Sequence, residues 1–127
     1  MTSEQEKWLA FACHLGGALG AILFANLGFL VPLIIWLIKR EESPHVNHHG
    51  KEALNFQLNM LLLGLALYLV LSLLRGSLFR PFDILQWHSL PWFSALLILN
   101  LVLSILASIE AYNGKKYSYP FIVRIVR

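Results

Sequence analysis

The sequence predicts an all-α protein: a polytopic bundle of membrane helices with three to four membrane segments. Of its 127 residues, 57% are hydrophobic and only 13% are charged, whereas about a quarter of the residues of an average soluble domain are charged. Residues 53–74 and 93–109 contain no charged side chain, and each approaches the roughly 20 apolar residues that a bilayer span requires. These spans leave no room for a soluble catalytic domain, so we expect a single membrane domain over residues 1–127.

The first apolar region, residues 8–38, is too long for one straight span and too long for a signal peptide. As a single helix it would measure about 45 Å, against about 30 Å of hydrocarbon. We expect a break between Asn26 and Pro32, because Asn-x-Gly favours a turn and proline removes a helical hydrogen bond. Two arrangements stay open: one kinked helix that crosses the bilayer, or a hairpin of segments 8–25 and 28–38.

Charged residues favour the hairpin, because short cytoplasmic loops are enriched in Lys and Arg. A hairpin places eight of the ten Lys and Arg residues on one side and leaves Arg75 and Arg80 on the other. A kinked span would move Lys7 across, giving seven against three. We therefore expect a multi-pass protein of the prokaryotic cytoplasmic (inner) membrane with both termini cytoplasmic.

The later segments follow the same pattern. Segments 53–74 and 93–111 read as spans, and the aromatic and charged side chains of residues 75–92 suit the headgroup level between them. Asn113-Gly114 predicts the end of the last helix. The tail, residues 115–127, combines apolar residues with arginines, and we expect it to lie in the membrane interface.

A run of polar residues, "SPHVNHHGKEALNFQLN" from Ser43, stands directly before an apolar segment. Serine followed by proline predicts a helix start. Amides in hydrocarbon need hydrogen-bond partners and ordinarily face a bundle interior or an aqueous cavity. Two uses stay open for them: hydrogen bonds between helices, or a polar groove for a substrate or a polypeptide. The candidate bundle or partner site is His14, His49, Lys51, Glu52, Asn55, Gln57 and Asn59.

The same run permits a metal site without indicating one. On a helix from Pro44, the side chains of His45, His49 and Glu52 share a face, at a spacing that can ligate one ion. However, Gly50 weakens the helix within the cluster, and no further ligand is dedicated to the site. We therefore expect no metal, no catalytic residue and no cofactor.

Four stretches carry a resemblance to a known family: "CHLGG", "PLIIWLIKREESP", "HGKEALNFQ" and "NGKKYSYP", at 13–17, 32–44, 49–57 and 113–120. They resemble a family of small prokaryotic membrane proteins of unknown function that is related to the Tic-twenty subunit of the chloroplast inner-envelope translocon. The resemblance implies a helical, four-segment fold and no established activity. His45 departs from the family pattern, and this argues further against a metal site.

For function we expect a non-enzymatic integral membrane protein that assists membrane-protein insertion, translocation or assembly. The alternative is an oligomeric small-solute or ion transporter or channel subunit. The expected partners are the lipid bilayer and other membrane proteins or further copies of the chain. No nucleic acid is expected, because the basic residues are scattered over segment ends.

Overall fold

The computed structural model describes residues 1–24, 27–75 and 91–127. In these ranges the chain forms four helices and no strand: α1 (Ser3–Phe24), α2 (Leu30–Lys39), α3 (Pro44–Leu74) and α5 (Pro91–Tyr112). Three of them, α1, α3 and α5, are long and apolar enough to cross a membrane. The all-α membrane bundle is thus confirmed. The predicted headgroup segment between α3 and α5 lies almost entirely outside the described residues, as does Asn26.

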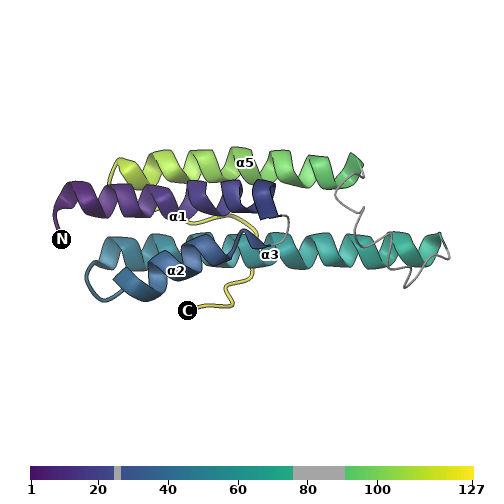
Figure 1. The fold of residues 1–127 in the computed structure, drawn as a ribbon, viewed down its shortest axis with the longest axis horizontal. Coiled ribbons are helices and arrows are strands. Elements are labelled where there is room, and N and C mark those ends of the chain that lie inside the picture. Colours follow the sequence, from purple (N-terminus) through teal and green to yellow (C-terminus); the bar gives the residue numbers. More distant parts are fainter. Residues whose placement is uncertain (25–26, 76–90) are drawn as a thin grey trace.

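The first apolar region is a helical hairpin, and the kinked single span is wrong. α1 and α2 run antiparallel, and α1 ends and α2 begins about midway along α3 (Figure 1). A Cβ atom added to Gly28 would stand 2.6 Å from the carbonyl oxygen of Gly17 and 2.8 Å from the backbone nitrogen of Ala21. Close approach of this kind requires small residues, as in other membrane helix pairs. Glycine at position 28 therefore lets the chain return directly against α1.

α3 begins where the sequence predicts. The Ser43 hydroxyl accepts a hydrogen bond from the backbone N–H of Val46 at 3.2 Å, and Pro44 occupies the first helical position. Gly50, which weakens the helix in isolation, is the point of contact with α2. A Cβ atom there would lie 2.8 Å from the Cβ of Trp36, so the missing side chain allows α2 to pack against α3.

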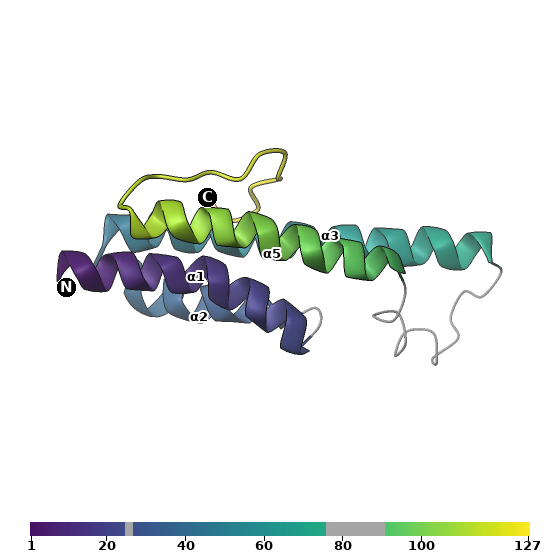
Figure 2. The same cartoon turned by 90° about the horizontal axis from the view of Figure 1, so that it is seen from above.

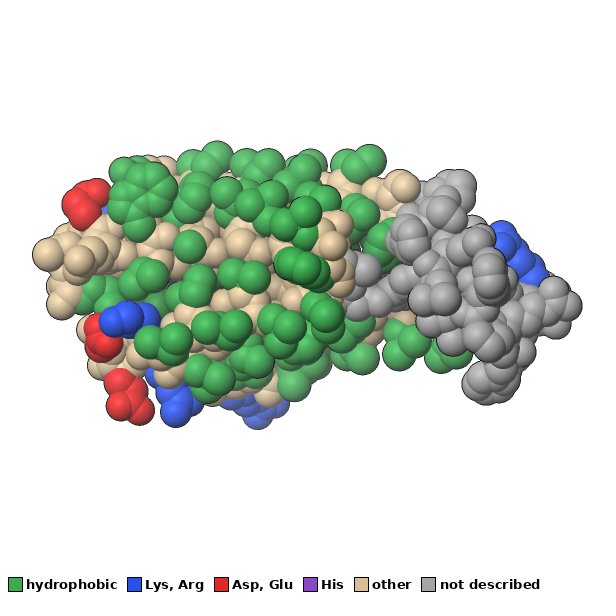
Figure 3. Space-filling model, in the orientation of Figure 1, with side chains coloured by type: hydrophobic (Ala, Val, Ile, Leu, Met, Phe, Trp, Pro, Cys, Tyr) green, Lys and Arg blue, Asp and Glu red, His purple; other side chains and the backbone are tan. Residues whose placement is uncertain are grey.

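Apolar side chains cover the outside of the bundle. Figure 3 shows them over most of the described surface in that view, with acidic side chains gathered where α1 begins and α2 ends and basic side chains there, along the lower edge and at the opposite end. Leu73 and Leu74, at the other end of α3, are 64% and 78% exposed. Exposed leucines in such number indicate that lipid surrounds the helices up to this end.

The segment after α5 doubles back along the bundle instead of leaving it. α5 ends at Tyr112, and Gly114 reverses the chain with a φ of 75°, a left-handed conformation that glycine adopts without strain. Residues 115–127 then follow the helices without regular secondary structure (Figure 2). Within them Tyr119 is buried and stacks on Phe56 of α3, with ring centroids 4.0 Å apart. The predicted interfacial tail is therefore docked on α3.

Candidate functional site

The histidines of α3 hold the end of α5 and the start of the tail. Each uses its Nε2 atom to bind a backbone carbonyl, and since a carbonyl oxygen only accepts, each Nε2 must carry the proton. The partners of His45, His48 and His49 are, in turn, the carbonyl oxygens of Ala111, Tyr117 and Lys115, at 2.9, 3.0 and 3.0 Å. Three histidines of one helix thus donate hydrogen bonds to one returning segment.

A buried chain of hydrogen bonds links α1 to this cluster. The Nε2 of His14 lies 2.9 Å from the Nδ1 of His49, and the Nδ1 of His14 lies 2.9 Å from the hydroxyl of Tyr119. Because His49 donates through Nε2 to Lys115, its Nδ1 must accept, so His14 donates through Nε2 and accepts from Tyr119. Burial raises the pKa of the Tyr119 hydroxyl above its ordinary value, which keeps the donating proton in place.

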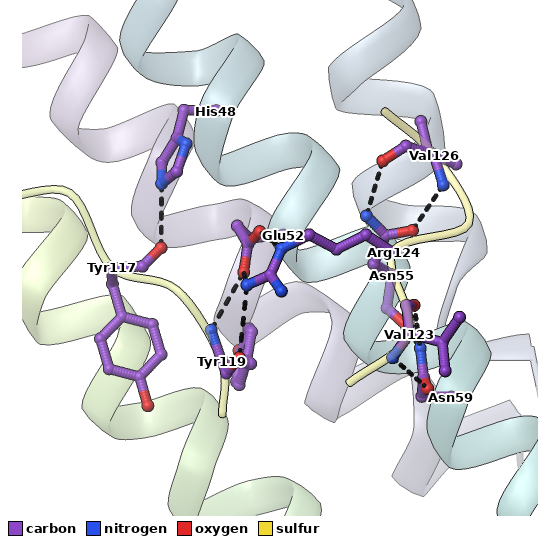
Figure 4. Close-up of polar contacts among 9 residues, drawn as sticks. All are labelled: His48, Glu52, Asn55, Asn59, Tyr117, Tyr119, Val123, Arg124 and Val126. Carbon is purple, nitrogen blue, oxygen red and sulfur yellow. Dashed lines mark hydrogen bonds and ion pairs between the residues drawn. The ribbon is translucent and has the colours of Figure 1, made fainter. Parts of the chain in front are cut away.

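Side chains in the second half of the polar run form hydrogen bonds with the backbone of the tail. The Glu52 carboxylate accepts from the backbone N–H of Tyr119 at 3.0 Å and from the Nε of Arg124 at 2.9 Å. One and two turns further along α3, Asn55 and Asn59 pair with the tail backbone as a neighbouring β-strand would (Figure 4). Each amide donates to and accepts from a single tail residue, which is Val126 for Asn55 and Val123 for Asn59.

This pairing supplies what a non-helical backbone needs inside an apolar environment. Each backbone N–H or C=O group without a hydrogen-bond partner in hydrocarbon costs roughly several kcal/mol. An extended segment forms no hydrogen bonds within itself, so its partners must come from other parts of the chain. A side-chain amide presents the same donor and acceptor as a peptide group. Asn55 and Asn59 therefore substitute for a missing strand.

Gln57 points to a different face and joins two helices. Its amide exchanges hydrogen bonds with the Asn100 amide of α5, at 3.0 and 2.9 Å, and the Ser104 hydroxyl donates to the same Asn100 oxygen. A cavity of about 30 Å³ adjoins this pair and is otherwise lined mainly by apolar side chains and by Ala21 and Gly28 of the hairpin. Its volume suits one or two water molecules.

Replacing Gln57 by leucine should destabilise the protein, because the buried NH2 group of Asn100 would lose the side-chain oxygen to which it donates. We expect Gln57→Leu to lower the free energy of unfolding by about 1–3 kcal/mol. Replacing both amides, in Gln57→Leu/Asn100→Leu, should recover most of this loss. Unfolding in mixed detergent micelles measures both, and a double variant that is at least as unstable as the sum of the single variants would contradict the pairing.

The predicted site residues divide into three groups. His14 and His49 meet in the buried chain, Glu52, Asn55 and Asn59 bind the tail, and Gln57 joins α5. Lys51 lies half-buried on α3 and joins none of the three groups. The three residues whose spacing permits a metal site do not converge on one point, because His45, His49 and Glu52 bind different points of the returning chain. Within the described ranges no group of three or more His, Cys, Asp or Glu side chains is arranged to hold a metal ion.

The sequence reasoning missed the other half of the site. Its members are Asn100, Tyr119 and Arg124 together with the tail backbone. One signal was available: α3 carries more polar side chains than its helix neighbours can pair, so an additional segment had to supply partners.

Comparison with known proteins identifies a family for the chain. No curated protein and no solved structure matches the chain. The model of the magnetosome magnetite crystal formation protein family matches residues 5–126, almost the entire sequence. The match agrees with the predicted small prokaryotic membrane-protein family. The chain belongs to the magnetosome magnetite crystal formation protein family.

Proposed function

We propose that this chain is a non-enzymatic membrane protein that assists the insertion, translocation or assembly of other membrane proteins where magnetite crystals form. One observation carries the proposal: most polar side chains of the candidate site bind the chain's own backbone. The imidazoles of α3 donate to carbonyls, and Glu52, Asn55 and Asn59 hold the tail. Apolar side chains cover the outside, so the surface offered to neighbours is suited to lateral contact within the bilayer.

Location and topology belong to the same proposal. The family description supports a place in magnetosome crystal formation, and the excess of Lys and Arg on one side supports cytoplasmic termini in the inner membrane. The resemblance to the Tic-twenty family adds an analogy for a role in translocation, and analogy of fold alone does not establish function.

Photo-crosslinking in the native membrane tests the proposal. A photoreactive amino acid replaces Leu69 of α3 or Val102 of α5, whose side chains are 41% and 49% exposed, and Ala107, which is fully buried, is the matched control. We expect the two outward positions to capture other membrane polypeptides and Ala107 to capture none. Recovery of lipid alone, or of further copies of this chain alone, from the outward positions would overturn the proposal.

A second candidate function, an oligomeric small-solute or ion transporter or channel subunit, is favoured by the cavity beside Gln57 and Asn100. Buried amides near the middle of broken helices line the paths of several transporter folds. Purified protein in liposomes should then pass protons, common ions or small solutes, and Asn100→Leu should reduce this flux. Absence of flux would remove this candidate.

A further inference from the structure

We infer that the protein favours curved membranes, because its α1–α2 hairpin inserts into only one leaflet of the bilayer. The leaflet that holds the hairpin is the convex one. The preferred ligand is thus a curved lipid bilayer whose convex face is on the side where α2 ends. This inference does not depend on the protein having protein partners.

The position of the bilayer follows from α3. Between Ala53 and Leu74 the helix has no charged residue, and these 22 residues measure about 33 Å at 1.5 Å per residue. That length matches the hydrocarbon thickness of about 30 Å. Because Leu73 and Leu74 are among the most exposed side chains, the hydrocarbon must extend to this end of α3. Its middle therefore lies close to Gly64.

The hairpin turns at that middle. Ala21 and Gly28, which face each other across the turn, line the same small cavity as Gly64 of α3 and Leu96 of α5. Gly64 lies ten residues before the end of α3, about 15 Å along the helix axis. α1 thus ends and α2 begins about half a bilayer short of the far surface, while α3 and α5 continue past this level (Figure 1).

The length of α2 agrees with this depth. Its 10 residues, Leu30–Lys39, measure about 15 Å, half of the hydrocarbon thickness. Its last residue, Lys39, pairs with Glu42 at 2.9 Å, and the Arg40 guanidinium lies 4.9 Å from the centre of the Trp36 ring. A charged end beside a tryptophan is typical of the headgroup level.

The described residues on either side of the turn expose apolar side chains. Leu23, Phe24 and Leu27 are 72%, 64% and 49% exposed, and at the bilayer middle this exposure meets acyl chains. α1 alone is long enough to cross a membrane. However, a bilayer placed around all of α1 would leave the exposed leucines at the end of α3 in water, and this arrangement is strongly unfavourable.

The described residues therefore fill the two leaflets unequally. In the described part of the chain, four helices and the docked tail occupy the leaflet next to the termini, and only α3 and α5 continue into the other (Figures 1 and 2). Extra inserted volume in one leaflet makes that leaflet prefer the convex face of a bend, as with shallowly inserted helices whose binding is curvature-sensitive.

Depth measurement gives the first test. A fluorophore attached at Leu27→Cys is quenched by brominated lipids that carry the bromine at shallow or at deep chain positions. The native Cys13 is fully buried and should stay unlabelled. We expect Leu27→Cys to be quenched best by deep bromines and Leu74→Cys by shallow ones. Strongest quenching of the Leu27 label by shallow bromines would overturn the inference.

Sorting between a giant vesicle and a thin tube pulled from it gives the second test. The protein carries a fluorophore at the N-terminus, and external dithionite separates copies whose N-terminus faces outward from those whose N-terminus faces inward. Outward copies should be severalfold enriched in the tube, where the outer leaflet is convex, and inward copies should be depleted. Equal sorting of the two orientations, or the reverse order, would overturn the inference.

A pair of variants links sorting to the hairpin. Leu23→Arg places a charge at the bilayer middle, where charge is costly, and should draw the end of α1 toward the headgroups. The ratio of protein density in the tube to that on the vesicle should then fall toward one. Leu74→Arg adds the same charge at the far surface and should sort like the parent protein. Helical content by circular dichroism checks folding, and if Leu23→Arg is unfolded, the comparison of orientations in the parent protein decides.

Discussion

Replacing Glu52 by alanine should detach the tail from α3 and lower the free energy of unfolding by about 2–4 kcal/mol. The carboxylate is 5% exposed and accepts from the Tyr119 backbone N–H and from the Arg124 guanidinium. Its loss leaves a buried N–H and a partly buried cation without their acceptor, and breaking a buried pair at one partner costs roughly 3–5 kcal/mol. The expected loss of unfolding free energy for Glu52→Ala is smaller than this general cost because the Arg124 side chain is 45% exposed.

The matched control is another carboxylate in the same protein. Glu110 pairs with Lys115 at 3.4 Å, but both side chains are more than a third exposed, and such pairs contribute about 0–1 kcal/mol. Unfolding in mixed micelles compares Glu52→Ala with Glu110→Ala, and limited proteolysis reports release of the tail. Equal costs for the two variants would show that the Glu52 contacts do not hold the tail.

Adding a side chain at Gly28 should have the other large effect, because the space it would enter is occupied by backbone. The new Cβ would lie 2.6 Å from the Gly17 carbonyl oxygen and 2.8 Å from the Ala21 nitrogen. Neither atom can rotate away as a side chain would, so α1 and α2 must separate. We expect Gly28→Val to lower the free energy of unfolding by about 3 kcal/mol, at the upper end of ordinary overpacking costs.

Gly20→Ala is the control at the same interface. The nearest atoms to its new Cβ are the Gly28 Cα at 3.2 Å and a Val31 methyl group at 3.3 Å, and a shift of a few tenths of an ångström relieves both contacts. Its cost should stay below about 1 kcal/mol. Thermal denaturation in detergent, followed by size-exclusion chromatography, ranks the two variants, and a Gly20→Ala protein as unstable as Gly28→Val would contradict the packing argument.

The elements of the fold were predictable because their signals are local. Ser43-Pro44 starts α3 through contacts within four residues, and Gly114 follows the end of α5. The predicted break lies between Phe24 and Leu30, near Gly28, whereas Pro32 belongs to the first turn of α2. Each signal depends on conformational preferences that nearby residues fix on their own. Length and hydropathy then place the resulting helices in a membrane.

The partners in the site were not predictable, for a physical reason. Asn55 and Asn59 bind backbone groups of Val126 and Val123, and almost every residue has the same backbone groups. No side-chain pattern in the tail therefore marks which residues will pair. His14 and Tyr119 are 105 residues apart, and a bond over that separation depends on the arrangement of all the helices between them. The polar side chains of α3 indicated that hydrogen-bond partners were needed, but the sequence did not indicate which residues supply them.

The docked tail has a consequence for how the protein is made. Residues 113–127 are synthesised after the four described helices, yet they supply partners of His48, His49, Glu52, Asn55 and Asn59. During synthesis these groups must remain hydrated or bind another chain until the tail arrives. Native packing around α3 thus finishes as a late step that follows helix insertion, and a nascent chain stopped before residue 119 should expose an unfinished polar face.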